Sequence, residues 1–157
     1  MAFTPNKDYK NDLKDKSSNL EMREIYSKID SKRLVSVVKR KKDITSGRQD
    51  LTDVERELQV AACNVKEGII TKPHRHLPQK RLTEKTHESI VVVKGKVESI
   101  IYDIDNKTVL EKVELGEGDC LIALDGGHSH TSLEENTLFY EFKNGPYHGV
   151  EKDREAI

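Results

Sequence analysis

The feature that most constrains the fold of this chain is a series of short, β-rich runs separated by turn residues. From residue 57 onward seven such runs follow one another at intervals of roughly ten residues. They span residues 58–65, 68–72, 89–93, 97–104, 109–115, 120–124 and 137–142. Short strands at this spacing, with no helical stretch between them, are typical of antiparallel sandwiches and barrels. The sequence therefore predicts an all-β fold.

Length and composition agree with a single domain that has a small core. The chain has 157 residues, of which 34% are apolar and 35% are charged, and it contains no Trp. A core built from β-branched and aliphatic side chains under a heavily solvated surface fits these values, whereas a large helical bundle does not. No run approaches the roughly 18 apolar residues of a membrane span, and the N-terminus lacks the apolar stretch of a signal peptide. We expect a cytoplasmic protein without a membrane partner.

The charges and histidines are unevenly distributed along the chain. Residues 1–50 contain 13 Lys and Arg against 8 Asp and Glu, residues 51–157 contain 14 against 20, and all six histidines lie between positions 74 and 148. The basic residues at 39–42 have no interleaved aromatic residues, so we interpret them as a solvated segment and expect no nucleic-acid partner. Cys63 and Cys120 form no CxxC pair, which gives no support to a disulfide framework or a thiolate metal site. The chemistry is expected in the C-terminal two-thirds.

Four segments are expected. Residues 1–17 are polar and lysine-rich and are predicted to form a mobile arm. Residues 18–56 are predicted to hold a short helix, because Leu20, Ile25 and Ile29 recur at near-helical spacing, followed by a strand at 34–38 and a polar connector. Residues 57–150 form the predicted barrel, and residues 151–157 a polar tail.

Two histidines separated by one residue are the first candidate metal ligands. His74 and His76 lie in the sequence PHRH (73–76) after a β run, where an extended backbone points both imidazoles to the same face. Neutral imidazoles suit Zn, Fe, Ni, Cu or Mn. Glu88 and His130, from later runs, are further candidates. Three imidazoles and one carboxylate can fill four positions of an octahedral site and leave two open.

With these residues in place, the stretch 57–147 resembles the cupins. The residues that carry the resemblance are Gly68, His74, His76, Glu88 and Gly95 for a first motif and Gly118, Gly127 and His130 for a second. The sequences PHRH (73–76) and FYEFKNGPY (139–147) are similar to those of small single-domain cupins encoded among O-antigen and sugar-nucleotide genes. The resemblance implies a double-stranded β-helix, or jelly roll, whose mouth holds a divalent transition metal (Fe, Mn, Ni or Zn) on His74, His76, Glu88 and His130.

Two departures from the family pattern leave ligand alternatives open. Eleven residues, 77–87, separate His76 from Glu88, where the family has three or four, and Glu84 or His87 is therefore an alternative to Glu88. His128 and His130 share one strand parity, so either can point inward. The insert 77–87 is expected at the barrel mouth, as a lid or clamp for an anion or as a surface loop.

The expected function is metal-dependent chemistry on a small polar, carbohydrate-like or anionic substrate, of the isomerase, epimerase or lyase type. Lys72, Arg81, Tyr102 and Tyr140 are predicted to contact this substrate. The alternatives are a non-catalytic sensor or binding protein and an Fe(II)-dependent dioxygenase. A homodimer is expected, because the apolar strand at 34–38 would otherwise expose a pairing edge.

Overall fold

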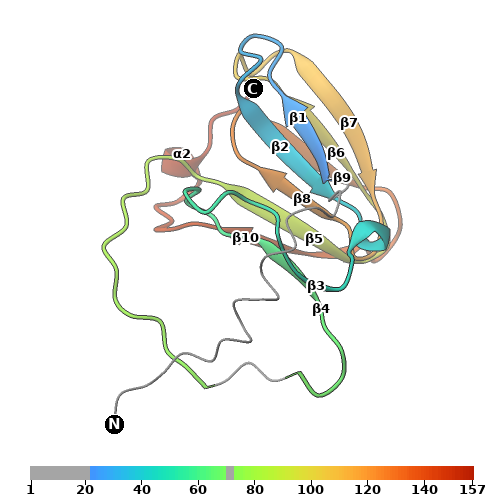
Figure 1. Cartoon of the computed structure of the whole chain (residues 1–157). Helices are drawn as coiled ribbons and strands as arrows, with labels where there is room; N and C mark the ends of the chain where they lie inside the picture. Colours follow the sequence, from blue (N-terminus) through green and yellow to red (C-terminus); the bar gives the residue numbers. More distant parts are fainter. Residues whose placement is uncertain (1–21, 70–72) are drawn as a thin grey trace.

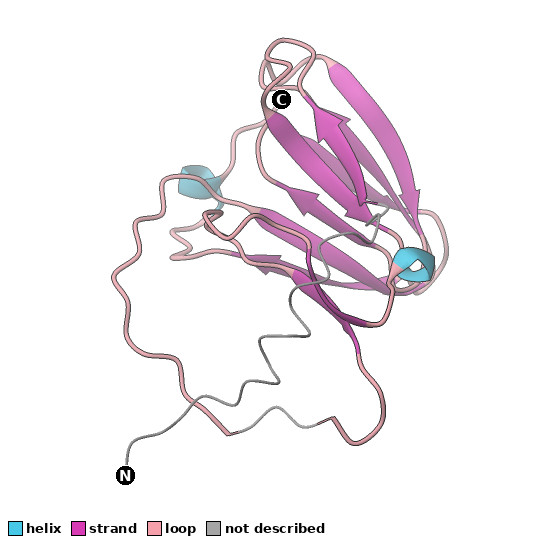
Figure 2. Ribbon diagram, viewed as in Figure 1, coloured by secondary structure: helices cyan, strands magenta, loops and turns pink. Residues whose placement is uncertain are grey.

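The structure of the protein is a computed structural model, of which residues 22–69 and 73–157 are described (Figures 1 and 2). The strands are β1 (Met22–Tyr26), β2 (Leu34–Lys39), β3 (Gly47–Asp50), β4 (Ala61–Asn64), β5 (Glu88–Lys94), β6 (Val97–Tyr102), β7 (Val109–Leu115), β8 (Cys120–Ala123), β9 (His128–Ser132) and β10 (Leu138–Lys143). In the described ranges two short helical segments accompany them, the 3₁₀ turn η1 (Lys41–Asp43) and the helix α2 (Val150–Asp153). The prediction of an all-β fold is confirmed.

The strands form three antiparallel sheets. A five-stranded sheet has the order β1-β2-β8-β5-β10, a three-stranded sheet has the order β7-β6-β9, and β3 and β4 make a separate pair. Over the described residues these sheets do not close into a barrel. The jelly roll that the family resemblance implies therefore remains a proposal.

The main core lies between the five-stranded and the three-stranded sheet. Its fully buried members come from both sheets, for example Val38 and Ile90 from one and Val97 and Ile101 from the other. A second cluster lies on the opposite face of the five-stranded sheet, where Leu51 packs against Val37 and Ile122. Two-sided burial explains why β8 is apolar at every position, since both of its faces are covered.

The prediction of a helix within residues 18–31 is wrong for residues 22–31, the part that the structure describes. Met22–Tyr26 is strand β1, which pairs with β2 and buries Ile25 in the main core. Ile29, which supplied the helical spacing, is exposed in the turn that follows. Sheet pairing and the burial of one side chain outweigh the weak helical period of three apolar residues. Residues 18–21 and the predicted arm at 1–17 lie outside the described residues.

The strand predicted at 34–38 exists as β2 but has no free edge. It is the second strand of the five-stranded sheet and pairs with β1 on one side and with β8 on the other. The argument that this strand needs a second copy to cover its edge therefore does not hold, and the homodimer remains a prediction without this support. The described residues contain no helix with both the length and the apolar side chains that a membrane span requires.

One end of the sandwich gathers the ends of strands from both sheets. β5 begins there at Glu88, β8 ends there at Ala123, and β9 begins there at His128. The turn from β8 to β9 needs Gly126, whose φ is +63° and where any Cβ would meet the carbonyl oxygen of Tyr102. This tight turn fixes where β9 starts, and so the position of its histidines.

Candidate metal centre

Three side chains converge at this end of the sandwich. Glu88 comes from the first position of β5, and His128 and His130 come from β9. Glu88 Oε1 lies 3.1 Å from His128 Nε2 and 3.8 Å from His130 Nε2. One ligand atom from each residue lies within 4.8 Å of the others. We refer to these three residues as the Glu88 centre.

The spacing of these donor atoms suits a bound metal ion. A first-row metal lies about 2.0 to 2.2 Å from imidazole nitrogen and carboxylate oxygen, which places neighbouring donors about 3 Å apart. The observed separations are close to this value, and both Nε2 atoms face the same carboxylate. Two imidazoles and one carboxylate are donors that divalent Fe, Mn, Ni and Zn accept. The Glu88 centre can therefore hold such an ion.

The alternation of β9 and one buried serine set the orientation of the histidines. His128 and His130 lie on one face of the strand because they are two residues apart, while Ser129 between them is exposed. Ser99 of β6 is directly opposite His130, is fully buried, and its Oγ lies 2.9 Å from His130 Nδ1. If the ring donates its Nδ1 proton to this hydroxyl, its Nε2 lone pair faces Glu88 and is available to a metal.

The ionisation of Glu88 also suits a cation. Burial alone would raise the pKa of this carboxyl group, but the hydrogen bonds and charges of His128 and His130 outweigh burial and hold the pKa well below its usual range. Glu88 is therefore a carboxylate at neutral pH. His128 Nε2 donates a hydrogen bond to the carboxylate oxygen Glu88 Oε1. A metal ion that binds at this nitrogen takes the place of its proton, because a ligating imidazole must be neutral.

The structure does not bring His74 and His76 into the Glu88 centre. Both are exposed in residues 73–87, a segment without sheet pairing that precedes β5, and their rings are 5.3 Å apart. In Figure 1 this segment lies outside the sheets. Of the four predicted ligands, Glu88 and His130 come together, and His128, which the sequence left as an alternative, joins them. The ligation by His74 and His76 stays a prediction.

The other two ligand alternatives lie elsewhere. His87 is buried, but it precedes Glu88 and lines a separate pocket of about 430 Å³ together with Leu124 and Asp125. Burial is the main cause that lowers the pKa of His87. Glu84 is exposed, and its backbone N–H donates to the Glu57 carboxylate.

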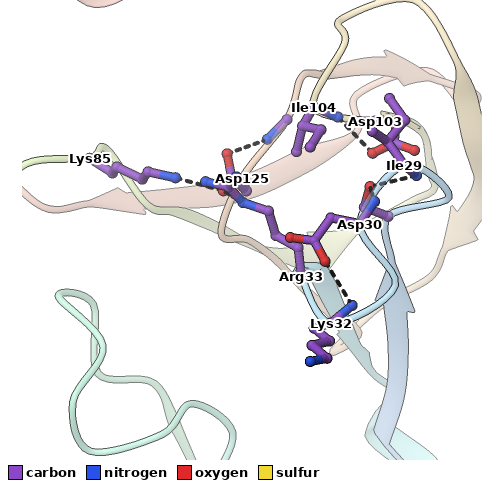
Figure 3. A network of polar contacts seen from close by, with 10 residues as sticks. Ile29, Asp30, Lys32, Arg33, Lys85, Asp103, Ile104 and Asp125 are labelled. Carbon is purple, nitrogen blue, oxygen red and sulfur yellow. Dashed lines mark hydrogen bonds and ion pairs between the residues drawn. The ribbon is translucent and has the colours of Figure 1, made fainter.

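The end of the insert 77–87 is fastened to the sheet by an ion-pair network rather than by the Glu88 centre (Figure 3). Lys85 Nζ and Arg33 Nε each lie 2.6 Å from Asp125 Oδ2. Burial would raise the pKa of Asp125, but these two cations and the N–H of Gly126 lower it. The insert thus reaches the site end of the sandwich through Lys85, while the preceding residues 77–84 are exposed.

The predicted substrate contacts are dispersed. Lys72 lies outside the described residues, and Arg81 is exposed on the loop. Tyr140 is exposed beside Phe142 and follows Phe139, whose ring lies 6.3 Å from that of His130, so alternation places Tyr140 on the far face of β10. Tyr102 is half-buried at the end of β6, next to Gly127. Among the described residues, the structure does not bring Arg81, Tyr102 and Tyr140 together.

Sequence reasoning missed Ser99 as the partner of His130. A serine in an apolar strand carries no motif, and only the register of β6 against β9 places it opposite the histidine. For His128 a signal did exist, because the pattern HxH at 128–130 repeats the pattern at 74–76.

Comparison with protein-family models, curated proteins and solved structures finds no match to this chain.

Ser99 offers a test of how the histidine is held. Replacing Ser99 by Ala is expected to lower metal affinity about 10- to 100-fold, the usual effect of losing the partner of a ligating histidine. Metal titration monitored by calorimetry measures this change, and urea unfolding of the metal-free protein measures stability separately. Ser99→Thr, which keeps the hydroxyl, should recover most of the affinity. Equal affinities for Ser99→Ala and the parent chain would show that Ser99 only fills space.

Proposed function

We propose that this chain is a cupin-like metalloenzyme that holds a divalent transition metal on Glu88, His128 and His130 and acts on a small polar, carbohydrate-like substrate. The observation that carries this proposal is the convergence of one carboxylate oxygen and two imidazole nitrogens at the end of the sandwich. One carboxylate and two imidazoles are a donor set that suits a divalent metal. The three residues come from strands, which hold ligands more rigidly than loops do.

Open coordination positions are the reason to propose catalysis. Three protein ligands leave room on the ion for a substrate or water, and a metal with open positions is typical of catalytic rather than structural sites. When bound, the metal would polarise a carbonyl or hydroxyl group, as isomerisation, epimerisation or elimination requires. The exposed loop with His74 and His76 precedes β5 and could supply further ligands upon metal binding.

A second candidate function is an Fe(II)-dependent oxygenase. It is favoured by one observation, namely that the Glu88 centre has the composition of the 2-His-1-carboxylate triad on which such enzymes bind iron. A non-catalytic binding or sensor protein is the third, since the same open positions can orient a ligand without turning it over.

The decisive experiment is elemental analysis followed by a substrate screen. The full chain is loaded separately with Fe(II), Mn(II), Ni(II) or Zn(II), and about one ion per chain is expected. Sugar phosphates and nucleotide sugars are then incubated in deuterated water, with oxygen uptake recorded. Deuterium incorporation without oxygen uptake supports the first function, and uptake restricted to the Fe(II) form supports the second. Binding without turnover supports the sensor, and failure to retain any of the four metals contradicts all three.

A further inference from the structure

The C-terminal segment 150–157 lies along the end of the sandwich that holds the Glu88 centre. In Figure 1 it leaves α2 and runs up the side of the sandwich to the C-terminus. Three contacts fasten it: Asp153 to Lys143, Arg154 to Glu141, and the end of Ile157 against Gly127, the residue before His128. The segment thus spans from β10, which borders Glu88, to the start of β9.

Lys143 is the cation that this segment engages, and it is a neighbour of Glu88. The two residues are directly paired across β10 and β5, so their side chains leave the same face of the sheet with Cβ atoms about 5 Å apart. Glu88 turns towards the histidines, while Lys143 Nζ lies 2.9 Å from Asp153 Oδ2 and 4.5 Å from the centre of the Tyr147 ring. Both side chains of the Lys143–Asp153 pair are mostly buried, with 19% and 12% exposed.

The charges beside the metal favour an anion once the ion is bound. One carboxylate and two neutral imidazoles leave a divalent ion with a net charge of about +1. Lys143, at the position of β10 paired with Glu88, adds a positive charge on this face, while Glu141 of the same face is paired with Arg154. An anionic group can then contact the metal and the ammonium group together. The group that now satisfies Lys143 is itself a carboxylate, and its hydrogen bond is the main reason why the pKa of Lys143 is raised.

We propose that Lys143 is the anion-binding residue of the Glu88 centre and that the ligand carries a carboxylate or phosphate group. Without this ligand Lys143 forms an ion pair with Asp153, and the ligand takes the place of the Asp153 carboxylate when it binds. The proposal rests on the proposed metal site and adds to it the class of ligand. It also gives the C-terminal segment a role, because the segment must give up one ion pair when the anion enters.

The test uses the full chain loaded with Co(II), whose visible spectrum reports on ligands of the metal, titrated with inorganic phosphate or with acetate. Removal of the competing carboxylate in Asp153→Asn is expected to tighten anion binding about fivefold, the worth of a modest ion pair. Lys143→Met should weaken it at least about tenfold, because a charge-assisted hydrogen bond is lost. The double variant should match Lys143→Met, since Asp153 acts only through Lys143.

Two neighbouring charges in α2 provide matched controls. Glu151→Gln and Lys152→Met make the same changes of charge as Asp153→Asn and Lys143→Met, but at exposed positions of α2, and should leave anion affinity unchanged. Co(II) binding is measured first in every variant. A parent chain that takes up no Co(II) would overturn the proposed metal site itself. Normal Co(II) uptake together with equal anion affinity in Asp153→Asn and the parent, or a gain that persists without Lys143, would overturn the inference alone.

Discussion

Replacing Glu88, His128 or His130 singly by Ala is expected to lower metal affinity at least about a hundredfold, because even the outer partners of ligating histidines are worth 10- to 100-fold. Each change removes one of the three donors that lie together within the described part of the chain. Calorimetric titration with Zn(II) measures the affinity, and elemental analysis after dialysis measures the retained metal. The loss should be similar for the three positions.

A histidine outside the site provides the control for this experiment. His148→Ala removes an exposed imidazole near the C-terminus and should leave the affinity unchanged. Unchanged metal content in any one of the three site variants would contradict the Glu88 centre. The double change of His74 and His76 to Ala tests the four-ligand prediction separately: a further loss of affinity is expected if the loop supplies ligands, and undiminished affinity would confine the site to β5 and β9.

The fold class could be predicted because most of the strands are apolar runs that can be recognised in the sequence. β7 has the bounds that the sequence predicts, and β2, β5, β6, β8 and β10 differ from prediction by a few residues at their ends. Of these strands, β2, β5, β6, β7 and β8 bury β-branched or aliphatic residues in the two core clusters, which are the residue types that favour strands. β3 and β9 are polar, with the sequences GRQD and HSHTS, so their strand structure depends on pairing: β3 pairs with the next strand, β4, and β9 with the more distant β6.

The site could be predicted only in part for a related reason. Glu88 begins an apolar strand, so its place at a strand end is visible in the sequence. The choice between His128 and His130 could not be made, because parity puts both on one face and the structure uses both. His74 and His76 belong to a loop without sheet pairing in the described residues, and no local pattern says where such a loop lies relative to the sheets.

The second large effect concerns Asp103, which joins the two sheets at the site end. Its side chain is fully buried and accepts hydrogen bonds from the backbone N–H groups of Lys28 and Ile104, each at 2.7 Å. Asp103 and Ile104 are labelled in Figure 3. Lys28 lies in the turn between β1 and β2, and Ile104 follows β6. Asp103→Ala leaves these part-buried N–H groups without their acceptor, and we expect it to lower the free energy of unfolding by about 1 to 3 kcal/mol.

The pH dependence of this loss follows from the direction of the pKa shift. Burial would raise the pKa of Asp103, but the hydrogen bonds from Ser27 and from backbone N–H groups lower it below the usual 3.8. A lowered pKa in the folded state means that the stabilisation is present above pH 3.8 and is lost as the pH falls through the folded value. Urea unfolding should therefore show the full difference in stability between Asp103→Ala and the parent at pH 7 and a smaller one below pH 3.8.

Asp50→Asn provides the control, because this exposed carboxylate pairs with Arg48, and its stability should stay within about 0.5 kcal/mol of the parent. A difference for Asp103→Ala that is equally small at pH 7, or that grows on acidification, would show that this carboxylate does not hold the turn between β1 and β2 against β6.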